Sequence, residues 1–199
     1  MTRHEDISVQ LRLRKSDIRF RVPRMKLLFS FVFALIAACS NGPVVDETKF
    51  HEPHQSPALG GPAILPTGRV TDAANIIDEE RESALSQQLA RLEQATKHQM
   101  AIVTVNTLEG RDISDFTADL GSAWGVGREG YNDGVVVLVA PNERRVTISV
   151  ADGLETALPD AACQLIIDQH MLPHFREGRL TEGIEDGVAA LIERLILAS

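Results

Sequence analysis

Residues 132–153, NDGVVVLVAPNERRVTISVADG, decide the predicted fold. Residues 135–140 form a continuous apolar run, which is typical of a central strand that is covered on both faces. The break at residues 141–143 is too short for the crossover that two parallel strands need. The alternating run at residues 145–150 is therefore expected to return beside the first strand as an antiparallel hairpin.

Helical patterns lie on both sides of this hairpin. Asp78 and Asp112 are predicted N-caps, the first for a helix to about residue 96 and the second for a helix that ends at Gly125. Apolar residues 100–105 predict a strand between them, and residues 69–72 predict a short extended segment before the first helix.

Two further helices follow the hairpin. Pro159 is expected in the first turn of one, which Pro173 would end, and Thr181 is expected to open the other. A helix that ends at Pro173 would not bring His170 and His174 to one face, so a surface histidine pair is favoured over a metal site. The residues expected to face the core are Ala84, Leu85, Leu89, Leu92, Ala95, Ile113, Phe116, Leu120, Trp124, Leu165, Ile166, Met171, Ile184, Val188, Leu191, Leu195 and Ile196.

This order of elements predicts an α/β fold: a three-layer α/β/α sandwich with a mixed central sheet that includes one β-hairpin. Cys163 lies within the third predicted helix and is expected to be a small buried hydrophobe.

The charge of the chain excludes one class of partner. The whole chain carries a net charge of −8, but from Cys39 onward 12 basic residues stand against 25 acidic ones, a net of −13. A folded domain this acidic repels phosphate backbones, so no nucleic-acid partner is expected.

The N-terminal region predicts export and a lipid anchor. Met25 and Lys26 precede the apolar run 27–38, which is too short to span roughly 30 Å of hydrocarbon and is typical of a signal peptide. The following Cys39 completes a pattern that resembles a bacterial lipobox, in which the cysteine becomes a lipidated N-terminus. Residues 1–24 are interpreted as a non-structural upstream extension, and both Met1 and Met25 stay open as the start.

The expected location is the bacterial cell envelope, with the membrane reached through the lipid anchor. Ser40 after the cysteine is similar to the sorting pattern for the periplasmic side of the outer membrane, if the organism is Gram-negative. Residues 39–66 are rich in proline and glycine and predict a flexible linker, and residues 67–199 predict the folded domain.

The hairpin places two carboxylates close together. Asp133 comes just before its first strand and Asp152 just after its second, with Glu155 three residues further on. Like charges across an antiparallel pair are destabilising, and a hard cation such as Ca²⁺ would remove that cost. The alternative is that Asn-Asp-Gly and Asp-Gly are only turn sequences, and the spacing leaves both interpretations open.

Several segments together resemble the TPM domain family. They are Ala101–Gly110, Trp124–Gly127, Asn132–Val139, Gly153–Glu155, Leu158–Asp160 and Leu172–Gly178, in the family's order over roughly residues 69–197. The resemblance implies an α/β sandwich, often exported or membrane-tethered, with acid phosphatase activity reported for plant thylakoid members and calcium bound in some members. It also implies that the family's acidic loop positions correspond to Asp133 and Asp72. Where the family commonly has Gly-Tyr-Gly, this chain has Ala151-Asp152-Gly153.

Two functions remain open from the sequence. The preferred one is a non-catalytic, divalent-cation-binding module that docks another envelope protein, with Asp133, Asp152, Glu155 and Asp72 as candidate ligands. The alternative is a metal-assisted acid phosphatase that hydrolyses phosphomonoesters, for which the catalytic residues are unknown and Arg128 is the candidate phosphate contact.

Overall fold

The computed structural model describes residues 64–199, so the predicted upstream extension, signal peptide and most of the linker lie outside the described residues. The described chain forms one four-stranded sheet in the order β1-β2-β3-β4. Its strands are β1 (Val70–Asp72), β2 (Gln99–Thr104), β3 (Gly134–Ala140) and β4 (Arg145–Val150). β1, β2 and β3 run parallel, and β4 is antiparallel to β3.

The predicted hairpin is confirmed. Val135 pairs with Val150 at one end of the ladder and Ala140 pairs with Arg145 at the turn. Every residue of β3 is buried, as expected for a strand that lies between helices on both faces.

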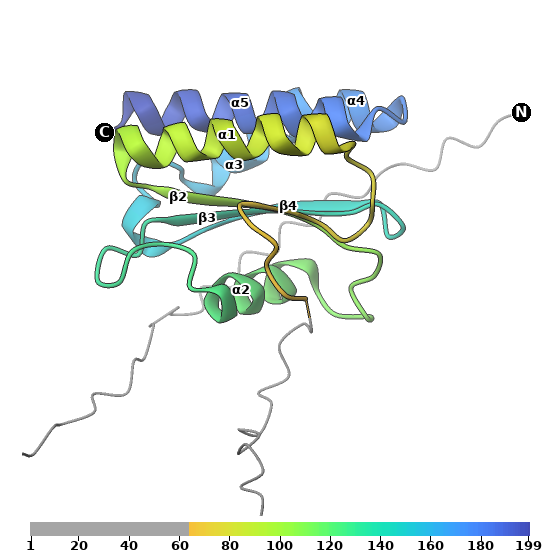
Figure 1. Ribbon diagram of the computed structural model, residues 1–199, viewed down its shortest axis with the longest axis horizontal. Coiled ribbons are helices and arrows are strands. Elements are labelled where there is room, and N and C mark those ends of the chain that lie inside the picture. The colour runs from red at the N-terminus through yellow and green to blue at the C-terminus, as the bar shows by residue number, and fades with distance from the viewer. Residues whose placement is uncertain (1–63) are drawn as a thin grey trace, which may run out of the picture. The chain divides into compact units, whose positions relative to one another are not determined.

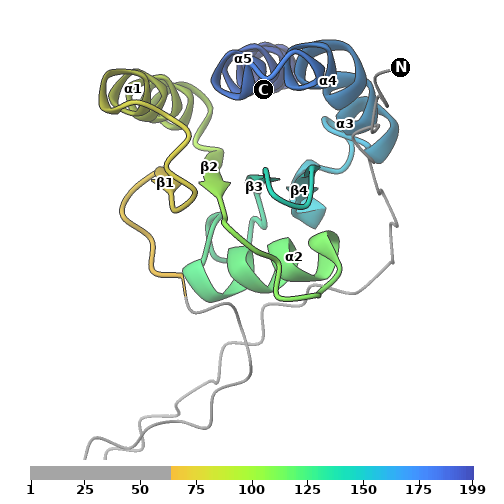
Figure 2. The ribbon, with the colours of Figure 1, turned by 90° about the vertical axis from the view of Figure 1, so that its right-hand side faces the viewer.

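Helices cover both faces of the sheet, so the predicted three-layer architecture is confirmed (Figures 1 and 2). One face carries α1 (Glu79–Thr96), α3 (Asp160–Ile166), a π-helical turn η2 (Ile167–Met171), α4 (Leu172–Arg176) and α5 (Leu180–Leu197). The other face carries α2 (Ile113–Trp124). A short 3₁₀ turn, η1 (Asp152–Leu154), follows β4.

The helix ends follow from local chemistry that the sequence already carries. The Asp78 side chain accepts a hydrogen bond from the Arg81 amide at 3.0 Å, and the Asp112 side chain accepts one from the Ser114 amide at 2.9 Å. Each carboxylate satisfies a backbone donor that a helix N-terminus leaves without an internal partner. Gly125 ends α2 with φ 64°, a left-handed conformation that glycine adopts without strain.

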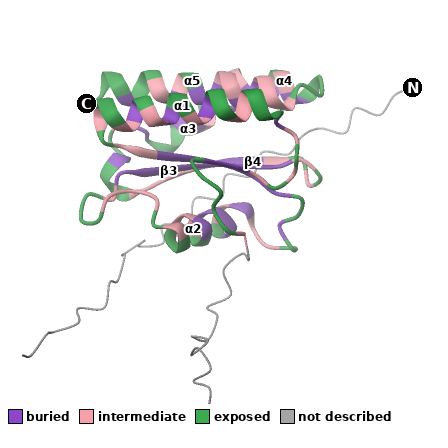
Figure 3. Ribbon diagram, viewed as in Figure 1, coloured by how far each residue is buried: buried purple, intermediate pink, exposed green. Residues whose placement is uncertain are grey.

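The core has two parts, one on each side of the sheet (Figure 3). The larger lies under α1, α3, α4 and α5, and the smaller lies between the sheet and α2. Ile64, near the end of the predicted linker, packs against the smaller part, and its carbonyl accepts a hydrogen bond from Trp124 Nε1 at 2.9 Å. Four expected core residues are wrong, because Leu165 is 52% exposed, Ile196 is 50% exposed, and Ala84 and Ala95 are also exposed.

The prediction that Pro173 ends the third helix is also wrong. The π-helical turn lets the Leu172 amide bond to the carbonyl of Ile167, so a new helix starts at Leu172. Pro173 then falls in the first turn of α4, where its missing N–H costs no hydrogen bond. The helical path therefore continues from α3 through η2 into α4.

Candidate functional site

The predicted site lies where β2 and β3 begin and β4 ends, at the loop 125–133 that joins α2 to β3. The Gln99 amide donates to the carbonyl of Asp133 at 3.1 Å, and the Gly153 amide donates to the carbonyl of Asn132 at 2.9 Å. The segments before β3 and after β4 are thus neighbours, as the hairpin predicts.

Glycine is required at this junction by the close approach of two backbones. A Cβ added to Gly153 would lie 2.0 Å from the carbonyl oxygen of Tyr131, and one added to Gly134 would lie 2.1 Å from that of Val126. No side chain fits in either place. The two glycines are explained by backbone packing without any ligand.

Asp133 turns its side chain into the loop and is only 3% exposed. Its Oδ1 accepts a hydrogen bond from the backbone amide of Arg128 at 2.7 Å. Its Oδ2 accepts one from Arg128 Nε at 2.7 Å, and Arg128 Nη2 lies 2.6 Å from the same oxygen. His98 Nδ1 approaches that oxygen at 3.5 Å. Both carboxylate oxygens are therefore occupied by N–H donors.

The Asp133 carboxyl group stays charged in this environment. Burial alone raises its pKa, but the hydrogen bonds from the Arg128 side chain and backbone, followed by the one from His98, hold the pKa below its ordinary value. A buried charge of this kind is tolerated because its opposite charge is bonded to it directly.

Arg128 is held from two sides. One edge of its guanidinium group bonds to Asp133, and its Cζ atom lies 4.1 Å from the centre of the Tyr131 ring. About a third of the side chain, 36%, remains exposed. The predicted phosphate contact is thus already engaged within the loop, with part of its surface open to solvent.

Two neighbours of the Asp133–Arg128 pair, His98 and Gln99, were not predicted as site residues from the sequence. Gln99 Oε1 accepts a hydrogen bond from the Gly127 amide at 2.8 Å, while Gln99 Nε2 donates to Glu93 Oε1 at 3.1 Å. His98 and Gln99 therefore connect the loop to the end of α1. No periodicity marks these residues, because their polar contacts cross from one element to another.

Asp152 and Glu155 do not join Asp133. Both are exposed, on or directly after the η1 turn, whereas Asp133 is buried beside Arg128. The repulsion that motivated a bridging cation is reduced, because the Asp133 charge is paired with Arg128.

Asp72 lies at the other end of the sheet. It pairs with Thr104 at the end of β2, whereas Asp133 lies beside Gln99 at the start of β2. Its Oδ2 accepts a hydrogen bond from the Ile77 amide at 2.8 Å, and the Thr104 hydroxyl donates to its Oδ1. Asp72 therefore shapes the connection from β1 to α1.

The four predicted ligands do not fit a single divalent cation. Asp133 is saturated by donors, Asp152 and Glu155 face solvent, and Asp72 is at the far end of the sheet. Within residues 64–199, no group of three or more histidine, cysteine or acidic side chains is arranged to hold a metal ion.

Two other reactive groups belong to the helical layer. His170 Nδ1 and His174 Nε2 approach Asp186 Oδ2 at 3.2 Å and 3.7 Å, which the continuous helical path from α3 to α4 permits. Cys163 is buried as predicted, and burial raises the pKa of its thiol to about 12. A thiol with that pKa carries almost no thiolate near neutral pH.

Among the described helices, none is both long enough and apolar enough to cross a membrane.

The layers and connections place the fold in the class of α/β sandwiches. Its three parallel strands are followed by one antiparallel strand, which forms a hairpin with the last of them. A family model described as the TPM domain matches residues 70–194, which is most of the described chain. The chain belongs to the TPM domain family, as its motifs predicted. None of the curated proteins matches it.

Solved structures agree with this assignment. The N-terminal domain of a protein from P. gingivalis is 33% identical, with 66% of this chain and 84% of that one covered and a TM-score of 0.62. The BA42 protein from Bizionia argentinensis is 19% identical over 60% of this chain and 81% of its own, with a TM-score of 0.54. The N-terminal domain of the cg2496 protein from Corynebacterium glutamicum is 16% identical over 70% of this chain and 84% of its own, with a TM-score of 0.50. The last two support the fold alone.

Proposed function

We propose that this chain is a lipid-anchored TPM-domain module of the bacterial cell envelope that binds another envelope protein and performs no catalysis. One observation carries the proposal: Asp133, the carboxylate expected to support metal or phosphate chemistry, has both oxygens bonded to Arg128. A carboxylate used in this way stabilises the loop 125–133 and is not free to act as a base, a nucleophile or a ligand.

The anchor and the linker support a role that depends on reach. Cys39 in its lipobox-like sequence would fix the chain to a membrane, on the periplasmic side of the outer membrane in a Gram-negative organism. A flexible linker of about 27 residues gives a mean span on the order of 30 Å, so the domain would search for partners near the membrane surface. Its acidity favours cationic partners over nucleic acid.

Mass spectrometry of the protein isolated from membranes tests the anchor. We expect a mature chain that starts at Cys39 and carries an acyl mass on that residue. The Cys39→Ser variant should carry no acyl mass and retain residues 25–38. A wild-type chain that retains those residues, or carries no acyl mass, would show that the anchor is absent.

Acid phosphatase activity is the second candidate, and one observation favours it. The Arg128 side chain is 36% exposed beside a charged carboxylate, so part of it remains accessible to an anion. Hydrolysis of p-nitrophenyl phosphate by the full chain distinguishes the two functions. We expect no turnover above background with or without Ca²⁺ or Mg²⁺. Turnover that a chelator and Asp133→Asn both remove, while circular dichroism shows that variant to be folded, would establish the enzyme.

Calcium binding stays a prediction with a sharp test. A Ca²⁺ ion at Asp133 would have to displace the guanidinium group that lies 2.6 Å from its oxygen. Calorimetric titration and melting curves should therefore show tighter Ca²⁺ binding in Arg128→Met than in the native chain, and a reduced effect in Asp152→Asn if that residue takes part. Native protein that binds Ca²⁺ as tightly as Arg128→Met would mean that the ion pair does not compete with the ion.

A further inference from the structure

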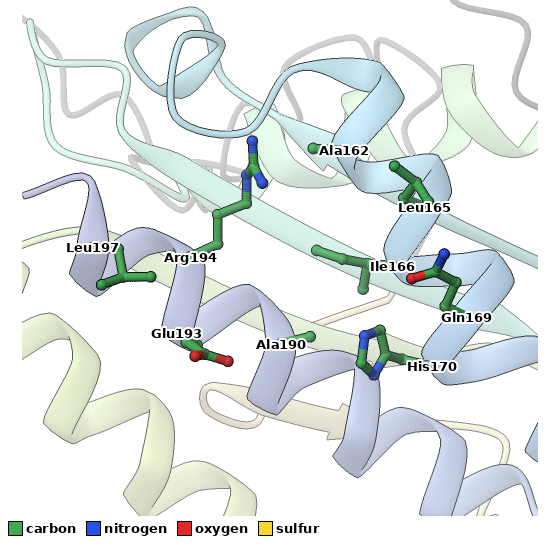
Figure 4. Close-up of a pocket in the computed structure, with 9 residues that line it drawn as sticks. All are labelled: Ala162, Leu165, Ile166, Gln169, His170, Ala190, Glu193, Arg194 and Leu197. Carbon is green, nitrogen blue, oxygen red and sulfur yellow. The ribbon is translucent and has the colours of Figure 1, made fainter.

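A groove runs between the α3–η2 segment and α5 on the outer side of the helical layer (Figure 4). Its volume is about 320 Å³. Leu165 and Ile166 line one wall, Leu197 lines the other, and Ala162 and Ala190 leave the space between them open. Its size is near the lower end of the range of roughly 300–1,000 Å³ that is usual for ligand sites.

Two of the apolar side chains that line this groove, Leu165 and Leu197, are not used by the core, whereas Ile166 is buried in it. Leu165 is 52% exposed and Leu197 is 80% exposed, and their neighbour Ile196 is 50% exposed. They account for three of the five large apolar residues that are exposed in residues 64–199. Single exposed leucines are ordinary, but Leu165 and Leu197 line one groove from adjoining helices, and such a pair marks a contact surface.

The π-helical turn η2 forms part of the same wall. Its residue His170 lines the groove next to Ile166, the last residue of α3. A π turn gives up regular α-helical hydrogen bonding, and such turns are frequent at functional sites. Here it continues the groove wall past the end of α3.

Charge indicates what kind of partner fits. The three elements that form the walls, α3, η2 and α5, carry six acidic residues and one basic residue, Arg194. Arg81 of α1 pairs with Glu182 and Glu185. Arg194 lines the groove beside Glu193, and its Nε donates to the carbonyl of Ala157 at 2.8 Å. The acidic residues of these walls that form no ion pair within the described part of the chain are Asp160, Asp168 and Glu193.

We propose that this groove binds a basic amphipathic helix of a partner protein. The apolar face of such a helix, with leucine-like residues at i, i+3, i+4 and i+7, would cover Leu165, Ile166 and Leu197. Its flanking lysine or arginine residues would face Glu193, which lines the groove, and Asp160 and Asp168 on the elements that form its wall. A second copy of this acidic chain or an anionic lipid surface would be repelled by the same charges.

The proposal rests on the proposed function, because it names the partner chemistry of the interaction module. The probe is a synthetic Leu/Lys peptide of about 15 residues with its leucines on one helical face, labelled for fluorescence anisotropy and titrated with the full chain. A peptide of the same composition with the leucines spread around the helix controls for charge alone, and a Leu/Glu peptide with the one-faced pattern controls for apolar contact alone. We expect binding of the one-faced Leu/Lys peptide only.

Matched variants locate the site. Leu197→Glu should weaken binding at least about tenfold, whereas Leu65→Glu, at a leucine that is 82% exposed and outside the groove, should leave it unchanged. Glu193→Lys should weaken binding several-fold and make it less dependent on salt, whereas Glu129→Lys, at an exposed loop position, should have little effect. Melting curves confirm that each variant is folded.

Two results would overturn the proposal: equal binding of the two Leu/Lys peptides, and binding that Leu197→Glu and Leu65→Glu weaken alike. Equal binding of the Leu/Glu peptide would also contradict it, because charge would then play no part. The outcome is separable from that of the proposed function. Phosphomonoester turnover with intact peptide binding would remove the non-catalytic function and keep the groove, while absence of both turnover and peptide binding would remove only the groove.

Discussion

The loop 125–133 and the groove between α3–η2 and α5 differ in whether their charged and apolar side chains find partners within the domain. In the loop, the buried Asp133 has both carboxylate oxygens bonded to Arg128, although Tyr131 of the same loop is 64% exposed. At the groove, Leu165 and Leu197 face solvent and Glu193 has no ion pair in the described part of the chain. A buried ion pair is suited to stabilising the fold, whereas apolar and charged side chains that face solvent are suited to binding a partner.

The largest effect is expected from breaking the ion pair of the loop. Arg128→Met would leave the 3% exposed Asp133 charged without its partner, and we expect a loss of about 3–5 kcal/mol of unfolding free energy. Urea denaturation of the full chain measures it as a lower midpoint at an unchanged slope.

The double variant Arg128→Met/Asp133→Leu is the control for that experiment. It removes both charges, so it should recover part of the loss, although the Arg128 amide then lacks its acceptor. A single variant as stable as the native protein would show that the loop does not depend on this pair.

A smaller effect is expected where α5 approaches η2 and α4. A Cβ at Gly183 would lie 2.5 Å from Phe175 Cε1 and 2.9 Å from the backbone oxygen of Met171, so Gly183→Ala should cost about 1–3 kcal/mol. At Gly187 the added Cβ would meet side-chain atoms of Met171, Cε at 2.3 Å and Cγ at 2.6 Å, and none of its three nearest contacts is a backbone atom, so the gain in helix propensity offsets more of the cost. Thermal melts should therefore rank Gly183→Ala below Gly187→Ala, and the reverse order would contradict this account of the packing.

Acid sensitivity separates the two regions further. Because the pKa of Asp133 is lower in the folded protein than its ordinary value of 3.8, its contribution to stability is complete above that value and is lost as the pH falls through it toward the lower folded pKa. Denaturation midpoints between pH 6 and pH 3 should fall less steeply for Arg128→Met/Asp133→Leu than for the native chain. Glu193→Gln, at the groove, should follow the native curve, since that side chain is exposed and forms no ion pair in residues 64–199.

Most of the fold was predictable because its determinants are local. The caps at Asp78 and Asp112, the stop at Gly125 and the hairpin at residues 134–150 each depend on neighbouring residues, and the structure confirms them. The helical period also predicted correctly that Leu85, Leu89 and Leu92 are buried.

The errors arose where one element depends on another. Leu165 and Ile196 fit the helical period but extend it beyond the face that the sheet covers, so they are exposed. Pro173 gave a false stop because a π turn, which no local pattern announces, moved it into a first turn. At the site, proximity of residues 133 and 152 was predictable from the hairpin, but the partner of Asp133 depends on a loop with left-handed residues at Gly127 and Asn132, with φ 109° and 49°.

The smallest effect is expected at the groove, where stability and binding should separate. Leu197→Glu replaces a side chain that is already 80% exposed, so the unfolding free energy should change by less than about 0.5 kcal/mol. The same variant is expected to lose binding of the basic amphipathic peptide, which Arg128→Met should retain at temperatures where it is folded. Urea denaturation and anisotropy on one set of samples measure both. If Leu197→Glu instead destabilised the chain as strongly as Arg128→Met does, the exposed leucine would belong to the core. The contrast between the paired charges of the loop and the exposed side chains of the groove would then fail.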